Sequence, residues 1–195
     1  QKLAPFDPRV RSLLLCSVSA FTGFAGIQQT LAFRLQDMLS LTGTETAQHM
    51  ALSLMSAAIM TLAMQLTIAQ RFKGAPIVLL RAGVALMMLG ALVIAAAGSF
   101  VWILVAMGTM GAGLGLAAPA IAAGASLAVT PQEQGSVAGL VTAFLAAGFV
   151  IGPIICGTLY TYDPTLSAIG AGCILLVALV TAFGGGGIRR RNAVR

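Results

Sequence analysis

A few polar side chains inside long apolar stretches are the residues of this 195-residue chain that could do chemistry. Gln28 and Gln29 form one pair of amides, and Gln65 is a third. Arg34 and Asp37 are three residues apart, so they share a helix face and can form an ion pair. Such groups are costly in an apolar medium, and they are therefore candidates for ligand binding.

Membrane-spanning helices are the elements that must position these residues. From Ala82 to Gln132 the chain has no Asp, Glu, Lys, Arg or His, a run long enough for two crossings of ~20 residues each. Charged residues make up only 8% of the chain, whereas a soluble domain has about 25%. Backbone amides in lipid must be satisfied within the segment, so we expect helices; the alternation typical of a barrel is not seen. Six blocks have spanning length: Ser12–Phe33, Ala47–Ala69, Pro76–Ala97, Phe100–Val129, Gly135–Tyr160 and Leu166–Phe183.

The basic residues predict the orientation. With six crossings both ends lie on one side, which collects ten of the eleven Lys and Arg residues and leaves only Arg34 opposite. Because basic residues concentrate on the cytoplasmic side, we expect both termini to be cytoplasmic. We divide the chain into a cytoplasmic linker (1–11), a transmembrane domain (12–184) and a basic cytoplasmic tail (185–195). We expect the tail to determine topology and to contact lipid headgroups, so the net charge of +6 does not predict nucleic-acid binding.

An enzyme is the least favoured class. The one histidine, His49, lies beside an outer loop, whereas Ser126 lies near the inner end of its block, so they cannot form a catalytic dyad. Cysteines occur singly within apolar blocks, without metal-ligand spacing. We expect no catalytic residue, no metal site and no cofactor.

Glycines are densest in the fourth and fifth blocks. Three pairs have the small-xxx-small spacing that lets helices approach closely in lipid: Gly111 and Gly115, Gly135 and Gly139, and Gly148 and Gly152. Pro119 and Pro153 lack an amide donor and are expected to bend their helices. The pattern fits a static bundle, and it also fits helices that rock and slide during alternating access.

Three segments resemble the last three spans of a major facilitator superfamily (MFS) transporter. They are Gly108-Thr-Met-Gly111-Ala-Gly113-Leu-Gly115-Leu-Ala-Ala-Pro119, Ala128-Val-Thr-Pro131-Gln-Glu133-Gln-Gly135-Ser-Val-Ala-Gly139-Leu140 and Gly148-Phe-Val-Ile-Gly152-Pro153-Ile-Ile-Cys-Gly157. The third is similar to the second copy of the family's antiporter motif, with Cys156 where a glycine is often found. Gln28-Gln29-Thr30, followed by Phe33-Arg34-Leu35-Gln36-Asp37, resembles the seventh helix of drug/proton antiporters. The resemblance covers essentially the whole chain.

This resemblance implies an all-α membrane protein whose six transmembrane helices form two inverted three-helix repeats, the C-terminal half of an MFS fold. It implies secondary active transport of a small molecule by alternating access, with proton-coupled efflux as the leading direction. The partners would be the substrate, a proton, membrane lipid and the missing N-terminal half. Because the chain begins with Gln1 rather than Met, we expect it to start inside a longer polypeptide. The alternative is a half-size structural or dimerising membrane subunit.

Some features depart from the family. The loop Gln70-Arg71-Phe72-Lys73-Gly74 lacks the acidic residue and flanking glycines of the full cytoplasmic motif. The glutamine pair is not followed by the residues typical of sugar porters, so a sugar is less expected as substrate. No carboxylate lies inside a block, and a proton-coupling group is expected in the missing half. A composition rich in Ala, Gly and Leu and poor in Lys suggests a bacterial inner membrane.

Helical geometry separates the binding candidates. Gln29 falls on a stripe of small and polar residues with Thr22, Gly26 and Gln36, so we expect it to face the cavity. Gln28 lies instead with Phe21, Phe24 and Leu35. The alternative for both glutamines is a bond between helices.

Other candidates have structural alternatives. Gln65 is a weaker binding candidate near the inner half of the membrane. Arg34 and Asp37 are either an interfacial ion pair or part of an outer gate. Residues expected to act in helix packing or as hinges are Gly111, Gly115, Pro119, Gly148, Gly152, Pro153 and Gly157.

Overall fold

Six long helices make up nearly all of the structure, a computed structural model that describes Ala4 and residues 7–184. The elements are α1 (Arg11–Leu39), α2 (Gly43–Met64), the π-helix η1 (Gln65–Ala69), α3 (Pro76–Ala96), α4 (Phe100–Leu127), the 3-10 turn η2 (Pro131–Glu133), α5 (Gln134–Tyr162) and α6 (Pro164–Gly184). No strand occurs in this part of the chain. Each predicted block corresponds to one helix, so the all-helical prediction is confirmed. The basic tail predicted at 185–195 lies outside the described residues.

Five helical segments are long and apolar enough to cross a membrane. They are Gly43–Ala69, Pro76–Ala96, Phe100–Leu127, Pro131–Tyr162 and Pro164–Gly184. α1 is not among them, although its 29 residues would extend about 44 Å, more than the ~30 Å of a hydrocarbon core. Its second half carries two adjacent glutamines and two charged residues, which lower its hydropathy. The prediction of six spans is therefore confirmed for five helices.

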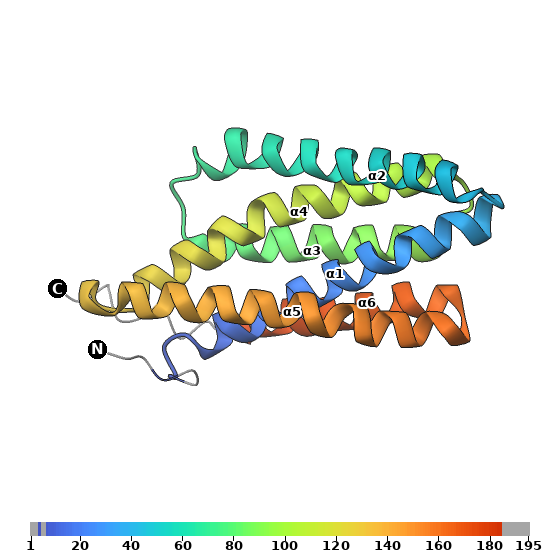
Figure 1. The fold of residues 1–195 in the computed structure, drawn as a ribbon. Coiled ribbons are helices and arrows are strands. Elements are labelled where there is room, and N and C mark those ends of the chain that lie inside the picture. Colours follow the sequence, from blue (N-terminus) through green and yellow to red (C-terminus); the bar gives the residue numbers. More distant parts are fainter. Residues whose placement is uncertain (1–3, 5–6, 185–195) are drawn as a thin grey trace.

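The helices run alternately in opposite directions (Figure 1). One end of the bundle, called the Ser40 end, carries the connections α1/α2, α3/α4 and α5/α6. The other end, called the Gly74 end, carries the connections α2/α3 and α4/α5. The first turn of α1 and the last turn of α6 also lie at the Gly74 end.

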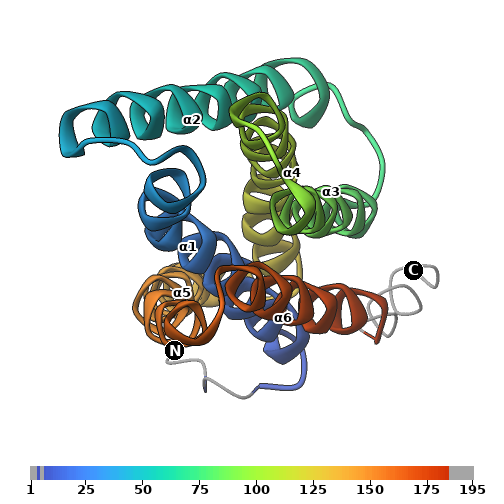
Figure 2. The same cartoon turned by 90° about the vertical axis from the view of Figure 1, so that its right-hand side faces the viewer.

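The bundle consists of two groups of three helices. α1 packs mainly on α5 and α6, and α4 packs mainly on α2 and α3. Contacts between α3 and α6 join the groups, as the end-on view in Figure 2 shows. Fully buried side chains from both groups form the core, among them Leu14, Ile27, Leu31, Leu80, Met87, Met107, Met110 and Leu175.

Two glycines bring α5 against the backbone of α1. A Cβ built on Gly148 would lie 2.9 Å from both the Val18 carbonyl oxygen and the Thr22 amide nitrogen. A Cβ built on Gly152 would lie 2.8 Å from the amide nitrogen of Gly26. No side chain fits between these backbones, as the small-xxx-small spacing predicts.

The same kind of contact holds α4 against its neighbours. A Cβ built on Gly111 would clash with the backbone of Ala57 in α2, and one built on Gly115 would lie 2.5 Å from the Thr61 carbonyl oxygen. The Thr61 hydroxyl donates to the Gly111 carbonyl at 2.8 Å. α3 approaches α4 in a similar way at Gly83. Both α1 and α4 are therefore fixed to other helices by backbone contact.

Gly135, Gly139 and Gly157 do not make such contacts. Within the described chain, nothing lies within 4 Å of a Cβ built on any of the three. The contact predicted for Gly135 and Gly139, and the packing role predicted for Gly157, are therefore not found between these helices. Gly157 directly follows Cys156, which faces α1, and one residue along a helix turns the side chain by about 100°.

Pro119 and Pro153 lie inside α4 and α5, and both helices continue through them. Each proline lacks an amide hydrogen, so the carbonyl four residues earlier loses its usual helical donor. The predicted bends and hinge role stay predictions.

Gly152→Ala is expected to lower the thermal unfolding midpoint of the purified full-length protein. A methyl group has no space between the backbones of α1 and α5, and overpacking of this kind costs about 1–3 kcal/mol. Gly139→Ala is the matched control on the same helix. Its methyl group meets no other atom of the described chain, and alanine is favoured over glycine in a helix by ~1 kcal/mol, so the midpoint should stay or rise. Equal midpoints for the two variants would contradict the close contact.

Candidate functional site

The second half of α1 carries the principal binding candidates on an exposed face. Gln29, Phe33 and Gln36 are exposed and recur at helical spacing, whereas Gln28 is half-buried. α1 lies between α2 and α5 (Figure 2). Only 11% and 17% of the most apolar stretches containing α2 and α5 are buried, against 39–61% in the other three segments. The exposed face of α1 is thus flanked by the two least buried apolar helices.

The predicted small and polar stripe of α1 is split in two. Thr22 and Gly26 are buried against α5, where the Cys156 sulfur occupies the space that a Cβ on Gly26 would need. Gln29 and Gln36, nearer the Ser40 end, are exposed. The glycines of α5 pack against Thr22 and Gly26, because only small residues allow the two backbones to come into contact there. Exposed polar residues therefore remain only in the second part.

A buried hydroxyl pair fixes another side of α1 at the level of Gln29. Ser167 of α6 donates to the Thr30 hydroxyl at 3.1 Å, and Thr30 donates to the Gly26 carbonyl at 2.9 Å. Both hydroxyl-bearing residues are buried. Because Thr30 faces the interior, its neighbour Gln29 is turned about 100° away from it.

Gln65 lies away from the other two glutamines. It is half-buried and begins η1, near the Gly74 end. Its carbonyl accepts the Gln70 amide at 3.2 Å, the five-residue spacing of a π-helix. Gln29 lies in the half of α1 that leads to the Ser40 end. The structure does not bring these glutamines together, and a binding role for Gln65 stays a prediction.

Arg34 and Asp37 contact different helices. One terminal guanidinium nitrogen of Arg34 donates, at 3.1, 3.3 and 3.4 Å, to the carbonyls of Ile94, Ala95 and Ala97. These carbonyls at the end of α3 carry the negative end of the helix dipole. Asp37 instead accepts a hydrogen bond from the Tyr160 hydroxyl of α5 at 2.5 Å. The ion pair expected from their spacing is not among the described ion pairs, because the end of α3 offers the guanidinium several acceptors.

A second charged cluster lies at the Gly74 end. The two terminal nitrogens of Arg9 donate to the two carboxylate oxygens of Glu133 at 3.1 and 3.0 Å, and Arg9 also pairs with Asp7 at 2.8 Å. Glu133 accepts the amide and hydroxyl of Thr130 as well, at 3.0 and 2.9 Å. Hydrogen bonds with Asp7 and Glu133 raise the pKa of Arg9, and the Arg9 guanidinium lowers the pKa of Asp7. The cluster ties the segment before α1 to the α4/α5 turn.

Tyr160 and the pairing of Arg9 with Glu133 were not predicted from the sequence. The spacing Thr130-Pro-Gln-Glu133 is a capping-box signal that identifies the turn. Arg9, 124 residues away, had no signal of its own. Tyr160 stands at the end of the fifth apolar block, where aromatic residues are common at membrane interfaces.

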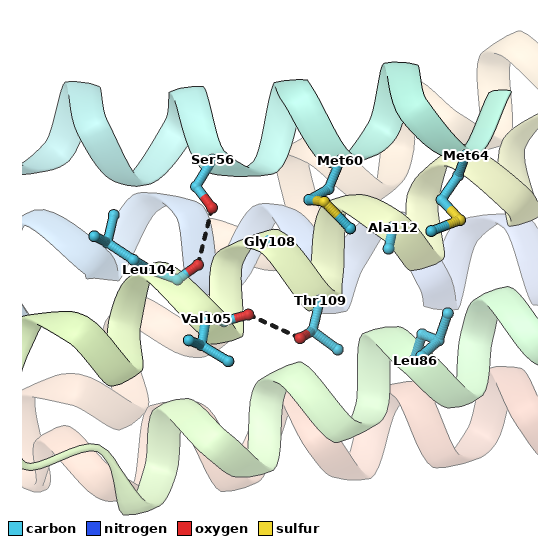
Figure 3. Close-up of a pocket in the computed structure, with 9 residues that line it drawn as sticks. All are labelled: Ser56, Met60, Met64, Leu86, Leu104, Val105, Gly108, Thr109 and Ala112. Atoms are coloured by element: carbon cyan, nitrogen blue, oxygen red, sulfur yellow. Dashed lines mark hydrogen bonds between the residues drawn. The ribbon is translucent and has the colours of Figure 1, made fainter. Parts of the chain in front are cut away.

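A groove of about 500 Å³ opens between α2, α3 and α4 (Figure 3). Its lining is Ser56, Met60, Met64, Leu86, Leu104, Val105, Gly108, Thr109 and Ala112. The two lining hydroxyls already donate to helix carbonyls, Ser56 to Leu104 at 3.0 Å and Thr109 to Val105 at 2.8 Å. The groove is therefore mainly apolar, and none of the predicted binding residues lines it.

The residues considered for acid–base chemistry lie at opposite ends of the bundle. His49 is near the start of α2, at the Ser40 end. Its ring packs edge-on against the Phe100 ring, with 4.5 Å between the ring centroids. Ser126 is in the last turn of α4, at the Gly74 end. No group of three potential metal ligands occurs in the described part of the chain.

Comparison with known proteins identifies the family. The sequence model of the Major Facilitator Superfamily matches residues 7–192. No match was found among curated proteins. The matched residues cover nearly the whole chain, and the chain therefore belongs to the major facilitator superfamily. Its members are membrane transporters of small molecules, and the chain is an integral membrane protein.

Arg34→Ala and Asp37→Ala are expected to lower the free energy of unfolding independently. The two side chains contact different helices, so the effects should add within about 0.5 kcal/mol in the double variant. Reversible denaturation of the full-length protein and its three variants measures this. A coupling energy above about 1 kcal/mol would show that the two residues interact directly as an ion pair.

Proposed function

We propose that this MFS chain is the C-terminal half of a secondary transporter that moves a small molecule by alternating access, with Gln29 as a substrate-binding residue. One observation carries the proposal. Gln29 is an exposed amide on α1, and it lies two residues beyond a stretch, residues 20 to 27, that is buried throughout. An exposed amide inside a membrane domain needs a polar partner, which water in a cavity or a substrate supplies. Gln28, being half-buried, has a lesser part.

The N-terminal half is proposed to cover α2 and α5. Large apolar side chains on both helices are exposed, among them Leu52, Met55, Ile59 and Leu62 of α2 and Phe149, Val150 and Ile154 of α5. These two helices flank α1 on either side (Figure 2), so a second half resting on them would enclose the exposed face of α1. A second copy of this chain is the alternative cover, and it would make the protein a half-size dimerising subunit.

The six helices are proposed to form two inverted repeats, α1 to α3 and α4 to α6. The packing supports this, since α1 contacts the second and third helices of the other triplet, and α4 does the same in return. The first helices of the two triplets also run in opposite directions (Figure 1).

The Gly74 end is proposed to face the cytoplasm of a bacterial cell, with the Ser40 end outside. This end or the chain close to it carries Arg9, Arg11, Arg71, Lys73 and Arg81, and cytoplasmic segments are enriched in basic residues. The Arg34 and Asp37 region would then be an outer gate.

Proton-coupled efflux is the proposed direction of transport, on the resemblance of α1 to the seventh helix of drug/proton antiporters. Every described carboxylate lies in a connection or within the first or last turn of a helix: Asp7, Asp37, Glu45, Glu133 and Asp163. The proton-binding group is therefore proposed to lie in the N-terminal half, and Arg34 and Asp37 to affect rate rather than affinity.

Gln29→Ala is expected to weaken substrate binding several-fold. The variant loses an amide hydrogen bond to the substrate, worth ~1 kcal/mol. The assay uses everted membrane vesicles with the full-length protein, in which ethidium uptake is followed while a pH gradient is imposed or collapsed. The apparent KM should rise in Gln29→Ala and change less in the matched variant Gln28→Ala.

Two results would contradict the proposal. Ethidium uptake that ignores the pH gradient would argue against proton exchange. An unchanged KM in Gln29→Ala, with the protein folded, would make both glutamines structural.

A further inference from the structure

One face of α5 carries a row of residues that meets α1 at every turn. The row is Gly148, Gly152, Cys156 and Tyr160, each four residues after the last. Gly148 and Gly152 touch the α1 backbone, the Cys156 sulfur lies against Gly26, and Tyr160 meets Phe33 and Asp37. The contact between the two helices therefore extends from Val18 to Asp37 of α1.

The side chains of this row become larger towards the Ser40 end. At Gly148 and Gly152 no side chain separates the helices, at Cys156 one sulfur does, and at Tyr160 a phenol ring does. Larger side chains at a contact hold helix axes further apart. Accordingly, α1 rises away from α5 towards the Ser40 end in Figure 1.

Tyr160 bridges the two helices where they have separated. Its ring lies 5.8 Å from the Phe33 ring, centroid to centroid, and its hydroxyl donates to the Asp37 carboxylate. These two contacts lie one and two helical turns beyond Gln29 on α1. Arg34 holds the same part of α1 from the other side, through the carbonyls of α3.

We propose that Tyr160 is a positioning residue for the part of α1 that carries Gln29. The ring acts as a spacer between the helices, and the hydroxyl bond to Asp37 prevents the end of α1 from moving further from α5. The functional importance of this placement rests on the proposed binding role of Gln29. The placement itself can be measured without any transport assay.

The test is the distance between α1 and α5 in the full-length protein in lipid nanodiscs. Spin labels on Gln36→Cys and Ala146→Cys, both exposed positions, report it by pulsed electron resonance, with the exposed Cys173 replaced by alanine. Tyr160→Phe keeps the ring and removes the hydroxyl, so the distance should shift to longer values. Tyr162→Phe is the matched control, because Tyr162 is 79% exposed, and it should leave the distance unchanged.

Variants of Asp37 separate a hydrogen bond from a charge effect. Asp37→Asn retains an oxygen that accepts the phenol hydrogen, so it should keep the wild-type distance. Asp37→Leu should shift the distance as Tyr160→Phe does, and the double variant should show no further shift. The proposal is overturned if Tyr160→Phe leaves the distance unchanged, or if Asp37→Asn shifts it as far as Asp37→Leu.

The same variants distinguish this inference from the proposed function. A distance shift accompanied by a raised KM for ethidium supports both. If Tyr160→Phe shifts the distance but Gln29→Ala leaves the KM for ethidium unchanged, the positioning role is supported and the binding role is contradicted.

Discussion

Direct backbone contact between α1 and α5 is the interaction on which the candidate site depends. In lipid, an apolar side chain gains little by exchanging a lipid chain for another helix, so association requires close packing and hydrogen bonds. Gly148 and Gly152 provide that closeness against residues 18–26 of α1. The contact fixes the rotation of α1 about its axis, and with it the direction of every side chain further along. Gln29 is exposed because this contact uses the neighbouring face, while Thr30 and Ser167 fasten the side towards α6.

The charged side chains mainly complete helix ends. Arg34 binds the terminal carbonyls of α3 at the Ser40 end, and Arg81 donates to the Ala182 carbonyl of α6 at the Gly74 end. Both contacts are made to carbonyls at the end of a helix, and both place positive charge at the negative end of a helix dipole. Each arginine also joins the two three-helix groups.

The sequence was sufficient to predict the helices, but it was not sufficient to predict which distant residues contact one another. The six helices were predicted from uncharged stretches of spanning length and from the Pro, Gly and Ser residues between them. The glycine spacing predicted the contacts at Gly111, Gly115, Gly148 and Gly152. The same spacing at Gly135 and Gly139 gave no contact, because spacing does not tell which face of a helix meets a neighbour. The local spacing of Arg34 and Asp37 suggested a pair, but both found stronger partners on α3 and α5, more than fifty residues away along the chain. Such long-range choices follow from the tertiary packing and have no signature within one segment.

Exposure of Gln29 to water within the membrane domain is the central claim, and the reactivity of a cysteine at that position tests it most directly. In this chain Cys173→Ala leaves two cysteines, both buried, so Gln29→Cys adds its reactive thiol, and the same background without Gln29→Cys measures labelling of any other thiol in the full-length protein. Leu176→Cys on α6, at a position that is 48% exposed among apolar neighbours, is the lipid-facing control. The account predicts that a water-soluble methanethiosulfonate reagent labels Gln29→Cys in membranes much faster than Leu176→Cys. Equally slow labelling at both positions would contradict it, since Gln29 would then face lipid or a sealed contact.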